Sequence, residues 1–261
     1  MTDAPDGYRY QLGFSAAHSE MYDPHGRAAK AEKAIAVMRD FAASPAGGAR
    51  ELSGLSLLDI GSSTGYLASQ YARAFGHVTG VDIDEPAVLH AQATHRAPNL
   101  TFAAGDSMKL EYPDASFDAV TCTHIYEHVP DQERLMGEIL RVLKPGGFCY
   151  FAAGNRLGLM EAHYRLPFLS WPPKWVSHRY LRLMRKGDEY YETHRTLWGL
   201  RRLAAGFIIH DYTLRVIRHP ERFAATDMLK PGTFRQRASA QIAERLFWIC
   251  PTYLWVLQKP R

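Results

Sequence analysis

The amino-acid sequence predicts an α/β fold in which a doubly wound, mostly parallel sheet carries helices on both faces. Two observations predict it: short apolar runs alternate with helical segments between residues 56 and 153, and a glycine-containing turn follows the first apolar run. Strands that alternate with helices favour a parallel sheet with crossover helices on both sides. The chain has 261 residues and a hydrophobic content of 46%, which suffices for one elaborated domain.

The segment before this alternation is expected to be helical in its second half. Residues 1–20 are polar and contain scattered glycine and proline, so we expect an irregular start without a secretory leader. Apolar residues recur at helical spacing over residues 26–43, and the following Ser-Pro-Ala-Gly-Gly stretch is expected to end that helix. Residues 1–50 are therefore predicted to form a helical cap.

The core of the sheet is predicted over residues 51–153. Apolar runs separated by turn residues predict its strands, and Pro145-Gly-Gly is expected to form a tight turn into the fifth of them. The expected strands are residues 56–60, 77–81, 100–103, 117–122 and 148–153, and the expected helices are residues 66–75, 86–94 and 131–143.

The pattern changes after residue 153. Residues 154–195 are rich in aromatic residues and proline and show no clean periodicity. Long connections of this kind are usually functional, so we expect an inserted substrate lid there. Residues 196–261 are expected to complete the sheet, with strands at residues 207–216 and 252–258 and helices at residues 196–205 and 238–247.

A glycine-rich turn is the strongest local signal for a ligand. Residues 57–65 read LLDIGSSTG, which places Gly61 and Gly65 between the first expected strand and its helix. Open α/β sheets bind ligands beyond the ends of their strands at such a point. The spacing lacks the GxGxxG pattern of dinucleotide sites, and Asp59 suits a cationic amino group better than a pyrophosphate. The alternative is that Asp59 merely caps the loop.

Two further carboxylates follow the next strands. Asp82 ends the second expected strand, where a carboxylate can accept from both hydroxyls of a ribose, although Asp84 and Glu85 compete for this role. Asp106 follows the third expected strand in the segment AAGDSM and could accept from an adenine amino group. A loop-capping role is the alternative for Asp106.

These segments, in this order and spacing, resemble the motifs of the class I S-adenosylmethionine-dependent methyltransferases of the type 11/12-like group. The resemblance rests on residues 57–65, Val81-Asp82, Gly105-Asp106-Ser107, FDAV at residues 117–120 and LKPGG at residues 143–147. It implies a seven-stranded Rossmann-like sheet whose last strand is antiparallel. Ser63 departs from the pattern, because many members carry a glycine there.

The resemblance also implies roles for individual residues toward S-adenosyl-L-methionine as the cofactor. Asp59, Gly61 and Gly65 would hold its methionine portion, Asp82 its ribose and Asp106 its adenine. The remaining expected cofactor contacts are Ser62, Ile83, Ser107 and Thr123.

A base for methyl transfer to a hydroxyl is expected just beyond the fourth strand, in the segment TCTHIYEHVP. His124 is the first candidate, and the alternative is a histidine that lines the pocket without moving a proton. Glu127 and His128 are expected to orient this loop. His163, in the lid, is the second candidate base. No metal site is expected, because the three cysteines are widely spaced and suggest buried packing.

Charge divides the chain into an acidic and a basic part. Residues 1–154 hold 12 Lys and Arg against 19 Asp and Glu, whereas residues 155–261 hold 19 against 8. The basic part could attract an anionic acceptor or an anionic membrane surface, or could be an ordinary solvated surface. No nucleic-acid signature is recognisable, no apolar stretch is long enough to span a bilayer, and we expect a cytoplasmic protein. The oligomeric state is left open.

The leading functional prediction is methyl transfer from S-adenosylmethionine to a small-molecule or glycan-like acceptor, at oxygen. A methyltransferase acting on protein or RNA is the enzymatic alternative. Two alternatives of other classes are a nicotinamide-dependent oxidoreductase, which the missing GxGxxG disfavours, and a non-catalytic nucleotide-binding module.

Overall fold

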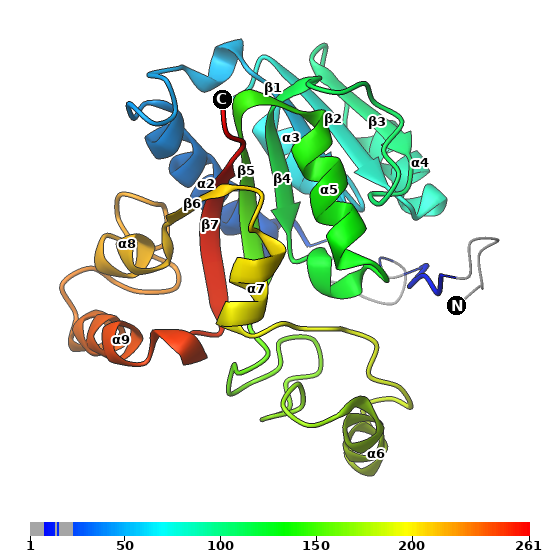
Figure 1. Ribbon diagram of the computed structural model, residues 1–261, viewed down its shortest axis with the longest axis vertical. Coiled ribbons are helices and arrows are strands. Elements are labelled where there is room, and N and C mark those ends of the chain that lie inside the picture. The colour runs from blue at the N-terminus through cyan, green and yellow to red at the C-terminus, as the bar shows by residue number, and fades with distance from the viewer. Residues whose placement is uncertain (1–7, 14, 16–22) are drawn as a thin grey trace.

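The computed structural model describes residues 8–13, 15 and 23–261, and it confirms the α/β fold. Within these residues seven strands form one sheet in the order β3-β2-β1-β4-β5-β7-β6 (Figure 1). The pairs among the first five strands are parallel, and β7 runs antiparallel to β5 and β6. The strands are β1 Ser56–Ile60, β2 His77–Asp82, β3 Leu100–Ala104, β4 Phe117–Thr123, β5 Leu143–Gly154, β6 Ile208–Asp211 and β7 Thr252–Gln258.

Helices cover both faces of the sheet. Buried residues of α2, α3 and α8 pack on one face, and those of α5 and α7 pack on the other. The helices are α2 Pro24–Ala42, α3 Tyr66–Tyr71, α4 Glu85–Thr94, α5 Gln132–Val142, α6 Lys174–Leu183, α7 Leu197–Leu203, α8 Thr213–Arg218 and α9 Phe234–Arg245. Short 3-10 turns are η2 Leu52–Gly54, η3 Tyr126–His128 and η4 Phe247–Ile249.

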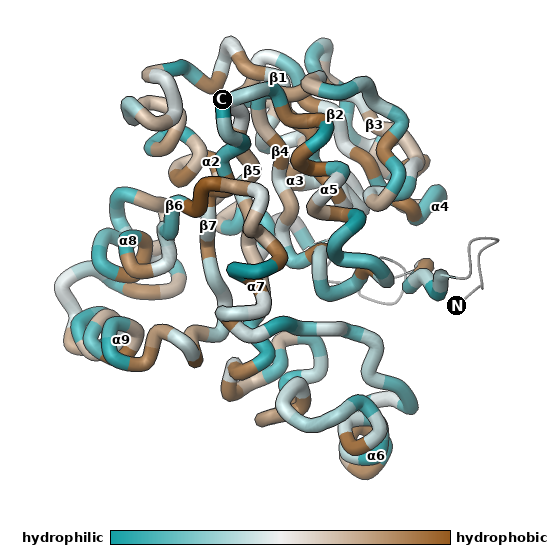
Figure 2. The backbone as a smooth tube through the Cα atoms, viewed as in Figure 1, coloured by the Kyte–Doolittle hydropathy of each residue, from teal (hydrophilic) through white to brown (hydrophobic). Residues whose placement is uncertain are grey.

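Each face of the sheet has its own hydrophobic core, because side chains alternate between the two faces along the strands. Leu57 belongs to the core under α2 and α3, whereas its neighbour Leu58 belongs to the core under α5. Successive side chains of a strand point to opposite faces, so a central strand buried on both sides is apolar throughout. Helices α6 and α9 differ from such a buried strand, because hydrophilic and hydrophobic residues alternate along them (Figure 2).

Most elements begin and end close to the sequence-based expectation, and the strands at residues 56–60 and 252–258 are confirmed to the residue. The expected strand at residues 207–216 is wrong in its second half, where β6 ends at Asp211 and α8 follows. The Asp211 carboxylate accepts from the backbone N–H of Thr213 at 2.8 Å and so helps to start the helix. Our expectation of an irregular start falls mostly on residues 1–7, 14 and 16–20, which lie outside the described residues.

Two other segments differ from expectation. The Pro145-Gly-Gly turn lies inside β5, which starts at Leu143 and loses register with β4 before pairing again from Phe148. Helix α6 lies within the segment predicted to lack periodicity, and the helix 238–247 begins earlier, at Phe234. Thr233 explains the earlier start of α9, because its side chain accepts from the N–H of Gln236. Pro172 and Pro173, which directly precede α6, are residues that could have predicted the start of this helix.

The ends of the strands place the site. Figure 1 shows α6 and the chain around it beyond the carboxyl end of β5, and the N-terminal segment beside the start of α5. Tyr8 fixes the latter contact by donating from its hydroxyl to Asp131 at 2.8 Å. Cys122, Cys149 and Cys250 are buried as expected. Among the described residues, no helix combines the length and apolar character needed to cross a membrane.

Candidate active site

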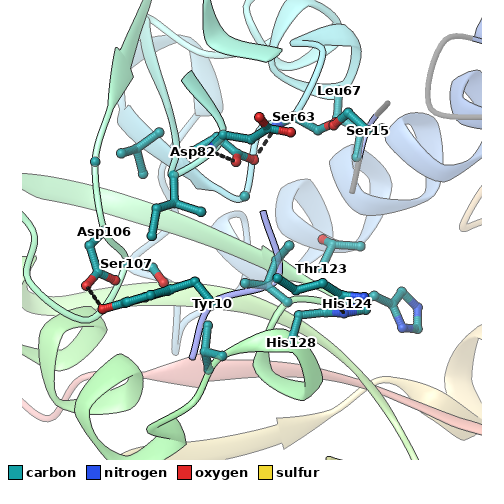
Figure 3. A pocket seen from close by; sticks show the side chains of 18 of the residues that line it. Tyr10, Ser15, Ser63, Leu67, Asp82, Asp106, Ser107, Thr123, His124 and His128 are labelled. Atoms are coloured by element: carbon teal, nitrogen blue, oxygen red, sulfur yellow. Dashed lines mark hydrogen bonds between the residues drawn. The ribbon is translucent and has the colours of Figure 1, made fainter. Parts of the chain in front are cut away.

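One cavity of about 350 Å³ lies at the carboxyl ends of β1, β2, β3 and β4 (Figure 3). The expected site residues that line it are Gly61, Asp82, Ile83, Asp106, Ser107, Thr123, His124 and His163. Three expected residues do not line it: Asp59, Ser62 and Gly65. Residues from the ends of β1, β2, β3 and β4 and from residues 154–195 therefore meet around this cavity.

The glycine-rich turn is held by its own geometry. Gly61 and Gly65 have φ values of +69° and +81°, a region that favours glycine. A Cβ on Gly65 would lie 2.6 Å from the Cβ of Ala91 and 2.7 Å from the ring of Phe102. Gly65 thus allows α3 to pack closely on α4 and β3, and its contribution to the cavity is indirect.

Asp82 joins this turn to the end of β2. Its Oδ2 accepts from the backbone N–H of Ser63 at 2.7 Å, and its Oδ1 accepts from the N–H of Asp84 at 2.9 Å. Burial raises the pKa of Asp82 above its usual value, although these backbone hydrogen bonds oppose the shift. The carboxylate lines the cavity and keeps further lone pairs for a ligand hydroxyl.

Asp59, near the carboxyl end of β1, is buried. Its Oδ1 accepts from the hydroxyl of Thr121 at 2.5 Å, while its Oδ2 has no hydrogen-bond partner among the described residues. Burial raises the pKa of Asp59 to about 7, with the charge of Asp82 adding to the shift and that of Arg27 opposing it. A buried carboxylate oxygen without a partner is costly, and a cationic ligand group would relieve that cost.

The N-terminal segment supplies lining residues that the sequence did not indicate. Tyr10 donates from its hydroxyl to Asp106 Oδ2 at 2.7 Å, and Figure 3 shows this side chain reaching across to Asp106. Asp106 Oδ1 accepts from the N–H of Met108 at 2.8 Å. No local motif marks such residues, because only the packing of the chain brings them to the sheet. The lining residues missed from this part of the chain are Tyr10, Gln11, Ser15, Arg27 and Lys30.

His124 stands at the other end of the cavity. Its backbone adopts a φ of 55°, and its N–H donates to the carbonyl of Ala152 at 2.8 Å, which fixes the residue between β4 and β5. Its Nδ1 lies 3.2 Å from Oε1 of the buried Glu127. Burial alone would raise the pKa of Glu127, but its hydrogen bond with His124 and nearby histidines outweigh burial and lower it to about 2.

A second histidine and carboxylate pair comes from the segment of residues 154–195. The Nδ1 of His163 lies 2.7 Å from Oε1 of the buried Glu161. Burial acts to lower the pKa of His163, but the hydrogen bond and charge of Glu161 raise it overall. Its ring meets that of His128 edge to face at 4.9 Å between centroids. Burial lowers the pKa of His128 to about 3, which keeps that imidazole neutral at pH 7.

Comparison with known proteins gives consistent results. The model of the methyltransferase domain family matches residues 58–151. A ubiquinone biosynthesis O-methyltransferase from Idiomarina loihiensis is 32% identical over 185 residues, which cover 67% of this chain and 73% of that protein. A sterol 24-C-methyltransferase from Gibberella zeae is 40% identical, but over only 36% of this chain and 26% of its own length.

Solved structures agree on the fold. A structure of an S-adenosylmethionine-dependent methyltransferase from Mesorhizobium loti superposes with a TM-score of 0.55 at 21% identity, covering 84% of this chain and 98% of that one. The domain matched by the family model, residues 58–151, contains the glycine-rich turn and most of the five parallel strands.

Proposed function

The chain belongs to the class I S-adenosylmethionine-dependent methyltransferases, and from this premise we propose that it methylates an oxygen atom of a small-molecule acceptor. The observation that carries the proposal is the single cavity, which has carboxylates at one end and His124 at the other. A relative that matches across most of its length is named an O-methyltransferase, which supports oxygen as the acceptor atom. Glycan-like acceptors remain within this class.

The residues around the turn fit the cofactor. We assign the unpartnered Oδ2 of Asp59 to its amino group, because a buried carboxylate oxygen needs such a donor. Asp82 would accept from the ribose hydroxyls and Asp106 from the adenine amino group, in place of Tyr10. The other proposed contacts are Gly61, Ile83, Ser107 and Thr123, which line the cavity, whereas Ser62 and Gly65 would act indirectly by shaping the turn. The bound cofactor supplies a methyl group activated by its sulfonium.

His124 is the proposed general base. Its Nδ1 pairs with Glu127, so its Nε2 is the nitrogen that can accept a proton from the acceptor hydroxyl. The buried Glu127 would hold the ring in place and stabilise the imidazolium that forms. His163, whose Nδ1 pairs with Glu161, is the second candidate.

We propose residues 154–195 as the lid over the acceptor. His163 and Ala162 line the cavity from this segment, which supports the proposal. An anionic acceptor would find Arg27 and Lys30 in the cavity wall. Contact with an anionic membrane surface is a further proposal, supported by the basic second part of the chain and by the exposed Trp175 and Trp198. We also propose a cytoplasmic location.

The test of the base assignment separates binding from turnover. His124→Ala and His163→Ala should each bind S-adenosylhomocysteine as the parent protein does in a calorimetric titration. Loss of a general base should slow turnover by about 100-fold or more, measured as S-adenosylhomocysteine release with a panel of phenolic and sugar hydroxyl acceptors. The matched control is His77→Ala, which removes an exposed histidine at the amino end of β2. Full turnover in both cavity variants would remove both assignments.

A further inference from the structure

Buried carboxylates and imidazoles gather where the lid meets the end of β4. Three glutamates there are 1–3% exposed, and three histidines lie among them. The group consists of Glu127, Glu161, Glu192, His128, His163 and His194. Within the described part of the chain, histidines supply all ion pairs of these carboxylates, and no lysine or arginine does so. Buried carboxylates that lack strong cationic partners favour the binding of a cation.

Three of these side chains can reach one common point. Glu127, His128 and His163 each offer a ligand atom, and these atoms all lie within 4.8 Å of one another. Glu127 uses Oε1 for His124, while its Oε2 is buried and has no hydrogen-bond partner among the described residues. That oxygen is a separate indication of a missing ligand, because a buried carboxylate oxygen is ordinarily satisfied.

The two histidines are oriented as metal ligands usually are. The Nδ1 of His163 lies 2.7 Å from Oε1 of Glu161, and the Nδ1 of His128 lies 2.7 Å from Oε1 of Gln11. Both of these oxygens accept hydrogen bonds, so each Nδ1 is the nitrogen that carries hydrogen. In the neutral form of each ring, Nε2 is then the nitrogen that can bind a metal ion. A carboxylate or amide oxygen behind the imidazole is the common outer partner of a metal-bound histidine.

We propose that Glu127, His128 and His163 form a binding site for one divalent metal ion of the kind that imidazole prefers, with Zn²⁺ as the model ion. Two imidazoles and one carboxylate bind such ions and leave a coordination position open. His128 and His163 both line the cavity, so the open position would face the acceptor. A second set, Glu161, His163 and His194, is less suited, because both carboxylate oxygens of Glu161 already accept hydrogen bonds, one from His163 and one from the backbone N–H of Tyr164.

The role of the ion rests on the proposed methyl transfer. An ion in contact with the acceptor hydroxyl would make it more acidic and hold it in place. The hydroxyl proton would pass to His124, the acceptor oxygen would form a bond to the methyl carbon, and the bond between that carbon and sulfur would break. The products are the methylated acceptor, S-adenosylhomocysteine and one proton. His163 then serves as a metal ligand and His124 alone as the base.

The experiment measures metal binding without any acceptor. Chelator-treated protein is titrated calorimetrically with ZnCl₂ and, separately, with MgCl₂, and bound zinc is counted by elemental analysis after gel filtration. We expect one zinc per chain and much weaker binding of Mg²⁺, which prefers oxygen ligands. His128→Ala and His163→Ala should each weaken zinc binding by about 100-fold or more, and Glu161→Gln by about 10-fold. His77→Ala should bind zinc as the parent protein does.

Two results would overturn the site: absence of a stoichiometric zinc in the parent protein, or a zinc affinity in both ligand variants that equals that of the parent protein. The zinc count of the parent protein decides the question even if a ligand variant does not fold, which circular dichroism would reveal. Titration with S-adenosylhomocysteine and assay of turnover separate this proposal from the proposed function. If the protein binds the cofactor and turns over but binds no zinc, only the metal site is rejected. If it binds zinc but methylates no acceptor, only the methyl transfer is rejected.

Discussion

At the scale of single residues, the side chain of Asp59 shows how burial prepares a site for a charged ligand. The residue is only 3% exposed, one of its oxygens is paired with Thr121, and the other has no partner within the described residues. Burial raises its pKa to about 7, far above the usual 3.8. The ligand-free protein thus carries a carboxyl group that is half protonated near neutral pH.

This raised pKa makes stability depend on pH with a definite sign. The stabilising contribution of the protonated carboxyl is fully present below about pH 4, the unfolded value, and is lost as pH rises through about 7. The ligand-free protein should therefore become less stable between about pH 4 and pH 7, by at most about 4 kcal/mol for the shift to a pKa of about 7. Urea unfolding at several pH values measures it.

The control for this effect is Asp59→Asn, which keeps the shape and cannot ionise. The decline attributable to this residue should disappear in the variant. An equally steep decline in the parent and in Asp59→Asn would show that the raised pKa is not expressed in solution.

At the scale of elements, close packing around one glycine joins β1 to its helix. Gly65 combines a φ of +81° with contacts that leave no room for a Cβ against Ala91 and Phe102. Other glycines lack such contacts: Gly137, within α5, would carry a Cβ with no heavy atom within 4 Å. The same residue type thus has opposite consequences in two elements.

Gly65→Ala should lower the free energy of unfolding by about 2 kcal/mol or more, because it adds backbone strain to an overlap with α4 and β3. Gly137→Ala should raise it by about 0.5–1 kcal/mol, because alanine favours the helix. Chemical denaturation of both variants measures the pair. The explanation fails if Gly65→Ala is as stable as Gly137→Ala.

One lysine at the start of α6 connects parts of the proposed lid. The Nζ of Lys174 donates to the carbonyls of Tyr190, Tyr191 and Glu192 at 3.1, 2.5 and 2.5 Å. These bonds connect the helix to the chain segment that returns toward the sheet. Burial lowers the pKa of Lys174 to about 8, with Glu192 and Glu189 opposing the shift.

Lys174→Met should leave three carbonyls without their donor and loosen the lid, at a cost of about 1–3 kcal/mol. We expect faster hydrogen exchange over residues 174–192 and a higher KM for the acceptor. S-adenosylhomocysteine affinity should stay unchanged, because its proposed contacts lie outside the lid. Lys186→Met, an exposed lysine after α6, is the matched control. Unchanged exchange in Lys174→Met would contradict a tethering role.

At the scale of the whole molecule, the cavity draws on segments that lie far apart in the chain. Tyr10, Asp82, Asp106, His124 and His163 all line it. A ligand that contacts them together is expected to stabilise the native fold as a unit. Stabilisation by a bound ligand therefore distinguishes a methyltransferase from the nicotinamide-dependent alternative.

Saturation with S-adenosylhomocysteine at about 100 times its Kd should stabilise the protein by about 2.7 kcal/mol. For a chain of this size that corresponds to a rise in Tm of about 5–10 °C. NAD at the same concentration should leave Tm unchanged. Differential scanning calorimetry measures both, and stabilisation by NAD alone would favour an oxidoreductase instead.

The fold class was predictable from the sequence because its signals are local. The alternation of strands and helices, the glycine turn at residues 57–65 and the acidic residues at strand ends each lie within a short window. Errors arose where a local contact overrode the pattern. At residues 207–216 the Asp211 side chain helps to start α8 on a segment whose composition suits a strand, and at α6 aromatic residues obscured the helical spacing.

The sequence by itself therefore determined the parallel sheet, the turn and the ends of the strands at which Asp59, Asp82 and Asp106 lie. Only the tertiary structure decided that Tyr10 meets Asp106 and that His163 lies beside His128. Periodicity and turn chemistry act over a few residues, so they can be read in order along the chain. Contacts between segments far apart in the chain depend on how residues 154–195 and the N-terminal segment pack against the sheet. No short sequence pattern encodes that packing.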